Sequence, residues 1–266
     1  MKSPSIRYRS RYIPQVPVTG DLRRAVRLVK NAQAPTITVS LNDFFTPNGD
    51  LNKHFDKARS RKLHGYLDYD GEILLSTDIK DFLCDILSPD KYVHIVNTLQ
   101  PDYVTTFDTY CYDDQPSFIT QMKMVEALRK TCAAVGRVNA GVVGLALGPP
   151  NALFEWYSHC LVRAGAKNLA IPCYEQRVRG RKTKHVHAIS RRINFLRSSF
   201  PDTRIILLSV GPSRAWKVFS ADYYSSLSWF MVKEKDPVKK DNIRLGRLIR
   251  YRELSSKYAS QRMVNL

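Results

Sequence analysis

The fold is indicated by the stretch from residue 103 to residue 147, in which YVTTF (103–107) is followed by SFITQMKMVEALRKTCAAV (117–135) and VVGLAL (142–147). The first and last segments are short and almost continuously apolar, which is typical of strands buried on both faces of a parallel sheet. The middle segment repeats apolar residues every three or four positions, and this spacing predicts a helix. The order strand, helix, strand indicates a parallel α/β fold.

The same alternation extends outward from this stretch. Further strands are predicted at Thr36–Ser40, Asn168–Pro172 and Arg204–Val210, and further helices at Asn151–Ala164 and Lys184–Ser199. Periodicity alone does not separate a closed barrel from an open, doubly wound sheet. The 266 residues suit a single domain, and a (β/α)8 barrel usually needs about 250.

Composition changes at both ends of the chain. Residues 1–30 are basic and interrupted by Pro14 and Pro17, which predicts an N-terminal arm that either contacts phosphates or is simply solvated. Residues 31–236 are assigned to the α/β domain. Residues 237–266 mix apolar and basic side chains and predict a basic C-terminal helix packed on that domain.

The charge points to a polyanionic partner. Lys and Arg number 42 against 24 Asp and Glu, which gives a formal net charge of +18. Such a field attracts nucleic acid, although a generic basic protein gives the same total. A cluster of cations follows the strand that ends at Pro172, and we expect it to contact phosphates rather than only water: Arg177, Arg179, Arg181, Lys182 and Lys184.

Cysteine spacing and hydropathy argue against several other classes of protein. The five cysteines form no CxxC or CxC pair, which argues against a compact zinc site and against a disulfide framework, and predicts reduced thiols in a cytoplasmic protein. His185 and His187 would not share a face on a helix, so no metal site is expected. No signal peptide and no apolar run of about 20 residues is found, so no membrane association is expected.

Candidate site residues follow the predicted strands, because the active sites of parallel α/β folds gather at the carboxyl ends of the strands. Asp43 follows the first of these strands, and Asp108 directly follows the strand at 103–107, with Tyr110 close behind. Asp108 is placed to accept hydrogen bonds from the N–H edge of a guanine-like base, although a helix N-cap or a loop aspartate fits the same position. Gly148 and Gly211 follow two later strands and would let a ligand approach the backbone.

An ordered set of motifs resembles the tRNA-guanine transglycosylase superfamily. ILSPD (86–90) and QPDYVTTFD (100–108) resemble its "LSPE" and "SDIVMAFDE" segments, and DG (70–71) resembles its "DG" turn. Later segments resemble its "GIVQGG", "GYAIGG", "MGVGTPE" and "GVDMFD" motifs: VGLALG (143–148), NLAI (168–171), LSVGP (208–212) and SADYYS (220–225).

The resemblance implies a TIM barrel that exchanges guanine for a 7-deazaguanine base, and it is nearest the DNA-modifying (DpdA-like) branch. It implies DNA and a free 7-deazaguanine such as preQ0 as partners, no cofactor, and a covalent aspartyl-nucleoside intermediate. Asp108 matches the base-recognising carboxylate, with Tyr110, Gly148 and Gly211 as further base contacts. Asp43 is the best candidate for the general acid/base, although its local pattern SLNDFF (40–45) departs from the family's "DSGGFQ". The family's nucleophile falls at Ser225, so Asp222, the earlier aspartate of that motif, is the predicted nucleophile.

Three other functions remain open at this point. A tRNA-directed enzyme of the same superfamily is one, although the family's "CxCxxC…H" zinc motif is absent. A non-catalytic nucleic-acid-binding relative is the second, because Ser225 occupies the nucleophile's position. An unrelated α/β enzyme of phosphorylated metabolites is the third, but it would leave the basic ends of the chain unexplained. The preferred interpretation requires Asp43, Asp108 and Asp222 to share one mouth of the barrel.

Overall fold

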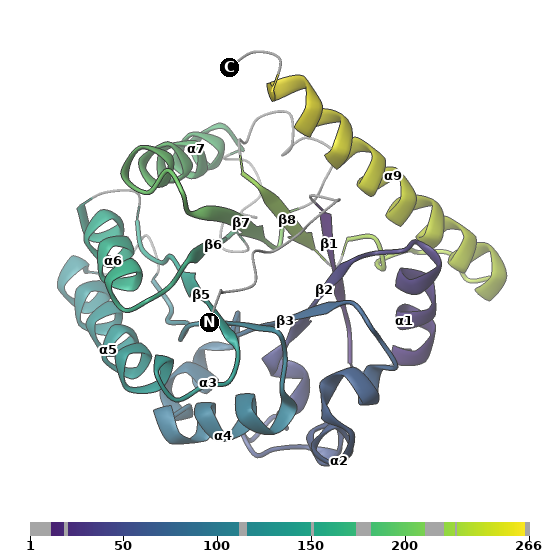
Figure 1. Cartoon of the computed structure of the whole chain (residues 1–266), viewed down its shortest axis with the longest axis horizontal. Helices are drawn as coiled ribbons and strands as arrows, with labels where there is room; N and C mark the ends of the chain where they lie inside the picture. The colour runs from purple at the N-terminus through teal and green to yellow at the C-terminus, as the bar shows by residue number, and fades with distance from the viewer. Residues whose placement is uncertain are drawn as a thin grey trace.

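The computed structural model of the chain describes residues 12–18, 21–111, 116–149, 152–173, 182–210, 221–226 and 228–263, with side chains for all of these except 182–186 and 255–263. Eight parallel strands close into a barrel in which each strand pairs with its neighbours in chain order and β8 pairs with β1 (Figure 1). The closed ring confirms the expected TIM barrel rather than an open sheet. The strands are β1 Tyr12–Val16, β2 Thr36–Ser40, β3 Glu72–Ser76, β4 Tyr103–Thr105, β5 Gly141–Leu145, β6 Asn168–Pro172, β7 Arg204–Leu208 and β8 Tyr223–Ser226.

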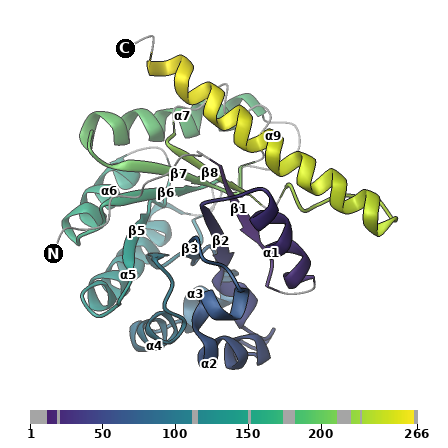
Figure 2. The same cartoon turned by 45° about the vertical axis from the view of Figure 1, so that its right-hand side comes forward.

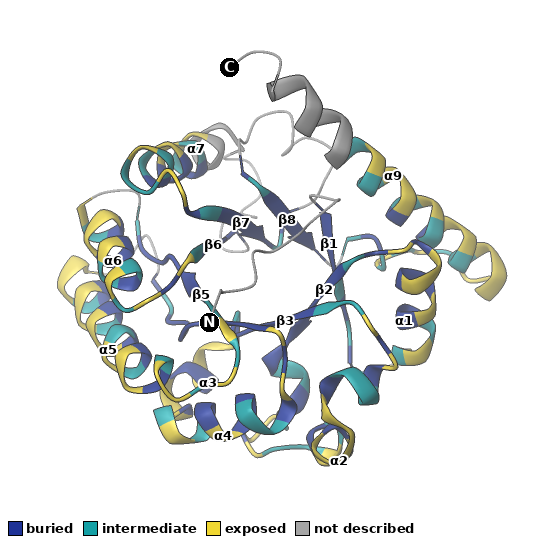
Figure 3. Cartoon of the chain, viewed as in Figure 1, coloured by how far each residue is buried: buried dark blue, intermediate teal, exposed yellow. Residues whose placement is uncertain are grey.

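Helices occupy the connections from β1 to β7 and, together with α9, lie outside the strands (Figures 1 and 2). Figure 3 shows that the strands are largely buried, whereas the outward faces of the helices are exposed, as expected for a core between barrel and ring. The helices are α1 Leu22–Asn31, the 3₁₀ helix η1 Leu41–Phe44, α2 Lys53–Leu67, α3 Asp81–Ile86, α4 Pro89–Leu99, α5 Ser117–Val135, α6 Ala152–Arg163, α7 Lys182–Ser199 and α9 Pro237–Met263.

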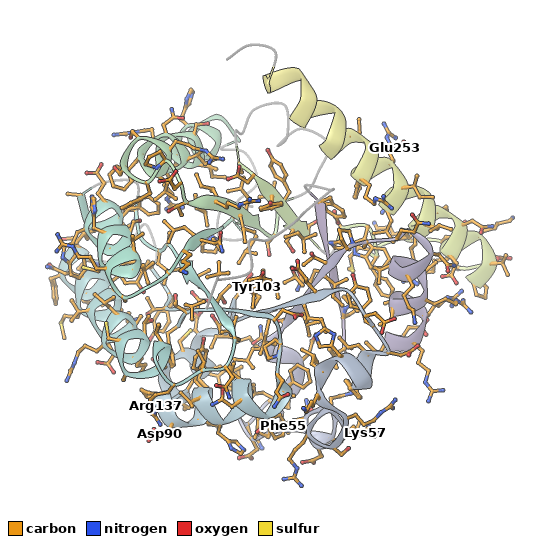
Figure 4. The ribbon with its side chains drawn as sticks, in the orientation of Figure 1. Phe55, Lys57, Asp90, Tyr103, Arg137 and Glu253 are labelled. Atoms are coloured by element: carbon orange, nitrogen blue, oxygen red, sulfur yellow. The ribbon has the colours of Figure 1, made fainter. Side chains whose placement is uncertain are left out.

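The barrel has two chemically different ends because all its strands run in the same direction. The carboxyl ends of the strands meet at one end, called the mouth here, where β2, β3, β4 and β8 finish at Ser40, Ser76, Thr105 and Ser226. The amino ends meet at the opposite end, called the base of the barrel. Tyr103, the first residue of β4, lies near the centre of the ring in Figure 4. A residue that follows a strand therefore belongs to the mouth, and one that precedes a strand belongs to the base.

Helix α2 changes direction within its length. It begins at Asn52, whose side chain accepts hydrogen bonds from the backbone N–H groups of His54 and Phe55. At Lys62 the backbone has φ 56° and ψ 171°, a conformation that is essentially restricted to glycine. After this kink, the hydroxyl of Tyr66 lies 2.8 Å from Nδ1 of His54. The side chain of Tyr66, past the kink, thus contacts the beginning of α2.

The first domain boundary lies earlier than the sequence indicated. Tyr12–Val16 form β1, which pairs with β2 and β8, and α1 follows within residues 22–31, so most of the expected arm belongs to the barrel. The strand was missed because it lies in a basic segment and contains Pro14, which removes one N–H from the ladder. The short strands β3 and β8 were missed as well, and β4, β5 and β7 end two residues earlier than predicted.

The expected C-terminal helix is confirmed as α9, which lies along α1 and β1 in both views (Figures 1 and 2). Asp241 accepts a 2.6 Å hydrogen bond from Nε of Arg24 on α1, and the ring of Tyr251 packs edge-on against Tyr12 of β1 at 5.3 Å. The helix therefore covers the start of the barrel. Among the described helices, none has both the length and the apolar character needed to cross a membrane.

Candidate active site

Hydroxyl and carboxylate groups line the mouth of the barrel. The hydroxyl of Thr77, just past β3, lies 2.7 Å from that of Thr105 at the end of β4 and donates to the carbonyl of Thr106. Thr106 in turn accepts a 2.8 Å hydrogen bond from the backbone N–H of Leu145 on β5. This network crosses three successive strands and holds the loops that follow them in one position, which is what a preorganised site requires.

Asp108 follows Thr106 by two residues, at the position that the sequence indicated. It is 4 % exposed, and its two oxygens accept hydrogen bonds from different backbone N–H groups: Oδ1 from Thr109 at 2.8 Å and Oδ2 from Ile79 at 3.2 Å. The contact with Ile79 also links the loop after β4 to the loop after β3.

Asp78, which the sequence analysis missed, follows β3 and lies across the mouth. Its Oδ2 accepts a hydrogen bond from the hydroxyl of Ser209 at 3.3 Å. Ser209 follows β7, which is four strands away from β3 in the ring of eight, so the contact spans the barrel opening. Asn42 fixes the Asp78 loop by donating from Nδ2 to the Asp78 carbonyl at 2.9 Å. The signal that could have identified Asp78 is the apolar run ILL at 73–75, followed at once by Ser-Thr-Asp.

Asp43 lies within η1, after β2, and its Oδ2 accepts a 3.0 Å hydrogen bond from the backbone N–H of Val18, after β1. Burial raises the pKa of the Asp43 carboxyl above its usual range, and the Val18 hydrogen bond opposes this shift only in part. Burial is the largest cause of a raised pKa of Tyr66, and the negative charge of Asp43 raises it further. The hydroxyl of Tyr66 contacts His54. A carboxyl group whose pKa is raised toward neutrality is suited to give and take protons.

Asp222 lies at the opposite end of the barrel, so the expectation that it shares a mouth with Asp43 and Asp108 is wrong. It directly precedes β8, and its Oδ2 accepts hydrogen bonds from the backbone N–H of Ile205 at 2.7 Å and from Arg197 at 2.5 Å. In a parallel barrel, a residue in front of a strand lies at the base. The contacts of Asp222 tie α7, β7 and β8 together there.

Ser225 lies inside the barrel rather than in the open mouth. It is 1 % exposed, and its hydroxyl donates to the hydroxyl of Thr38 at 2.9 Å. Thr38 is on β2 and Ser225 is on β8, with β1 between them, so this hydrogen bond runs through the barrel interior. The position that matches the family's nucleophile thus holds a buried, hydrogen-bonded hydroxyl.

Tyr110 and Gly148 have contacts that explain them without a ligand. The hydroxyl of Tyr110 faces Asp85 of α3 at 3.5 Å, and Nζ of Lys123 on α5 lies 3.0 Å from the centre of the Tyr110 ring. Gly148 has φ +102°, and a Cβ there would meet Met124 at 2.8 Å, so the loop after β5 requires glycine. Neither contact set tests the expected role in base binding.

The remaining predicted contacts cannot be placed in the same way. Gly211, Arg177, Arg179 and Arg181 lie outside the described residues. For Lys182 and Lys184, only the backbone in α7 is described.

The cysteines of the described residues form no disulfide, and three of them are buried: Cys84, Cys111 and Cys173. Within the described ranges, no three His, Cys, Asp or Glu side chains converge in the way that a metal ion would require.

Comparison with models of protein families and with curated proteins finds no match for the chain.

Proposed function

We propose that the chain is a base-exchanging transglycosylase that replaces guanine in DNA with a 7-deazaguanine derivative at the mouth of the barrel. The observation that carries this proposal is the set of carboxylates that follow three successive strands: Asp43 after β2, Asp78 after β3 and Asp108 after β4. Two further features support it, namely the resemblance of the motifs between residues 70 and 225 and the net charge of +18.

Asp78 takes the role of nucleophile in this proposal, in place of Asp222. Its carboxylate reaches across the opening to Ser209, where a nucleotide turned out of its stack would present its sugar. An oxygen of Asp78 forms a bond to C1′ of the nucleoside while the bond from C1′ to N9 of guanine breaks. The electron pair of that bond leaves with guanine, and the product is an ester between the Asp78 carboxylate and C1′ of the sugar.

Asp43 supplies and removes protons in both halves of the exchange. As the neutral acid it protonates the departing guanine, and it becomes a carboxylate. In the second half, that carboxylate takes the N9 proton of the incoming base, whose nitrogen then attacks C1′ and releases Asp78. The raised pKa that burial gives Asp43 favours the protonated acid needed at the first step.

Asp108 recognises the base. Guanine presents two adjacent N–H donors on one edge, N1–H and the 2-amino group, and a carboxylate accepts both at once. Oδ1 and Oδ2 of Asp108 are already oriented by the N–H groups of Thr109 and Ile79, so binding requires little rearrangement. Adenine lacks this donor pair, and we expect it to be excluded.

The decisive experiment measures incorporation of radiolabelled guanine or preQ0 into DNA and into tRNA by the wild-type protein and by Asp78→Asn. We expect incorporation into DNA, a covalent protein–DNA adduct on a denaturing gel, and loss of both in Asp78→Asn. Incorporation into tRNA alone would replace DNA by tRNA as the substrate. An adduct that persists in Asp78→Asn would overturn the choice of nucleophile.

A non-catalytic nucleic-acid-binding protein is the second candidate, and one observation favours it: the nucleophile position of the family holds Ser225, whose hydroxyl is buried and bonded to Thr38. Binding of DNA without any exchange or adduct would select this function. The exchange assay therefore separates the two candidates in a single series.

A further inference from the structure

The outer surface between α1 and α2 carries a groove that the proposed chemistry does not use. One cavity of about 440 Å³ lies near the beginnings of these helices, on the side of the mouth. A second cavity of about 480 Å³ continues along them toward the base. The two cavities share four lining residues, so they form one continuous groove, called the α1–α2 groove here. The shared residues are Leu22, Arg23, Arg61 and Tyr66.

The lining of this groove is strongly cationic. Its basic residues are Arg23, Arg27, Lys30, Lys57 and Arg61, and its acidic residues are Asp21 and Asp68. Burial and the nearby lysines Lys53 and Lys57 lower the pKa of His54, which also lines the groove, so His54 is neutral at neutral pH. Five permanent cations face two carboxylates, and the groove attracts anions.

The cations are arranged in two rows. Arg23, Arg27 and Lys30 are separated by four and three positions on α1, so they share one face of that helix. Lys57 and Arg61 are separated by four positions on α2, before the kink at Lys62. Neighbours in such a row lie about 4.5 to 6 Å apart along the helix axis.

Three of the five cations have no counter-ion in the described part of the chain. Lys30 pairs with Asp68 at 3.0 Å and Arg27 with Asp241 at 3.3 Å, whereas Arg23, Lys57 and Arg61 form no ion pair with any described residue. Lys57 lies at the periphery of the molecule, on α2 (Figure 4). Unneutralised like charges along a groove repel one another, and a bound polyanion relieves that repulsion while it releases its own counter-ions.

The end of the groove nearest the mouth leads to Asp43, the proposed acid/base. Val18 lines the groove, and its backbone N–H donates to Oδ2 of Asp43 at 3.0 Å. Tyr66 lines both cavities, and the kink at Lys62 returns its hydroxyl to His54, also in the groove. A DNA strand that followed the groove toward the mouth would therefore arrive beside Asp43.

We infer that the α1–α2 groove binds the phosphodiester backbone of DNA and leads the strand to the mouth of the barrel. This inference rests on the proposed function for the choice of DNA, but the groove and its charges are independent of the chemistry. The contacts are made to phosphates, so they position the strand without reading its sequence. An aromatic ring, Tyr66, lies among the cations and offers a surface on which a base can stack.

The test compares two triple variants that remove the same number of positive charges. Arg23→Gln/Lys57→Gln/Arg61→Gln alters the groove. Arg129→Gln/Arg163→Gln/Lys167→Gln alters exposed cations on the α5–α6 side, away from α1 and α2 in Figure 1. Binding of fluorescently labelled single-stranded and duplex DNA is measured by anisotropy over a series of NaCl concentrations. A labelled RNA of the same sequence is measured in parallel.

We expect the groove variant to bind DNA at least about tenfold more weakly and to lose about one unit of salt dependence for each removed cation. The control variant should retain most of the affinity and the salt dependence. Equal losses in the two variants would show that only net charge matters and would overturn the inference. Groove-dependent binding of RNA but not of DNA would overturn the choice of DNA.

The outcome is separable from that of the exchange reaction. The groove inference stands if the groove variant loses DNA affinity, even where wild-type protein exchanges no base. It fails if the groove variant binds DNA like the wild type, even where exchange is observed. In an active enzyme, the variant should raise KM for DNA and leave kcat at saturating DNA unchanged, because the groove contacts are the same before and during the reaction.

Discussion

At the base of the barrel two carboxylates are held in the same way, whereas at the mouth the carboxylates follow a different pattern. Each base carboxylate directly precedes a strand. It accepts a hydrogen bond from the backbone N–H of the second residue of the strand before that one. It also contacts a nitrogen-bearing side chain on the helix that leads into this earlier strand. The carboxylate, backbone donor and side chain are, in order, Asp102, Ile73 and His64 in one case and Asp222, Ile205 and Arg197 in the other.

At the mouth the carboxylates accept hydrogen bonds from backbone N–H groups and, in the case of Asp78, from the hydroxyl of Ser209. Asp108 is held by Ile79 and Thr109, and Asp43 by Val18. Asp43 forms no ion pair with any described residue, and burial raises its pKa. The comparison teaches that the base carboxylates connect a helix to two strands, while the mouth carboxylates are held by backbone N–H groups and a hydroxyl that follow the strands. Position relative to a strand, before or after, separates the two kinds.

The largest effect is expected for Asp78→Asn at the mouth. The substitution keeps the size of the side chain and removes the proposed nucleophile, so we expect the rate of base exchange to fall by at least about 10³-fold. The midpoint of thermal unfolding should change little, because the amide oxygen still accepts the hydrogen bond from Ser209. Exchange kinetics and a thermal scan on the same preparation check both statements. Wild-type rates in Asp78→Asn would remove Asp78 from the chemistry.

The next largest effect is expected at the base, for Asp222→Ala. This change leaves Arg197 and the N–H of Ile205 without their partner, and the loss of a charged hydrogen bond costs about 2 to 3 kcal/mol of unfolding free energy. In a domain of this size, that corresponds to a fall in Tm of roughly 5 to 10 °C. Exchange per folded molecule, measured well below Tm, should equal that of wild type. Loss of exchange at unchanged Tm would contradict the comparison of the two ends.

The sequence predicted most of the fold but only part of the site, and the same short strands explain both results. The strands at 36–40 and 168–172 were predicted with their observed bounds, and α5 was predicted residue for residue, because β-branched or apolar runs and helical spacing are strong local signals. β3 (EILLS) contains a single β-branched residue and β8 (YYSS) contains none, so they gave a weaker signal. Without β3, Asp78 could not be assigned to the mouth. Without β8, Asp222 could not be assigned to the base.

Asp43→Asn is expected to change Tm by a smaller amount than Asp222→Ala and in the opposite direction. Because burial raises the pKa of Asp43 in the folded protein, the ionised carboxylate destabilises the fold, and this cost is absent below the ordinary aspartate pKa, where the group is protonated in both states. The cost grows as pH rises through the raised pKa of the folded state. We therefore expect Asp43→Asn to raise Tm at neutral pH, by less than Asp222→Ala lowers it.

A pH series of thermal scans tests this sign. The gain in Tm should shrink as pH falls below the raised pKa of Asp43 and vanish below the ordinary aspartate range, while Asp222→Ala at neutral pH still shows its loss. The exchange rate of Asp43→Asn should fall about 10²-fold, as expected for the loss of a general acid/base. A variant less stable than wild type at neutral pH would show that Asp43 is a structural carboxylate like those at the base.

The smallest effect is expected for Ser225→Ala, which lies between the two ends of the barrel. The change removes one buried donor and leaves the hydroxyl of Thr38 without it, at a cost of about 1 kcal/mol in unfolding free energy. Exchange should be unaffected, because Ser225 is buried within β8 and does not reach the mouth. Thr38→Val is the matched control, since it removes the acceptor of the same hydrogen bond and should give a similar loss of stability. If Ser225→Ala abolishes exchange while Thr38→Val does not, then Ser225 takes part in the chemistry, and the boundary drawn here between mouth and interior is wrong.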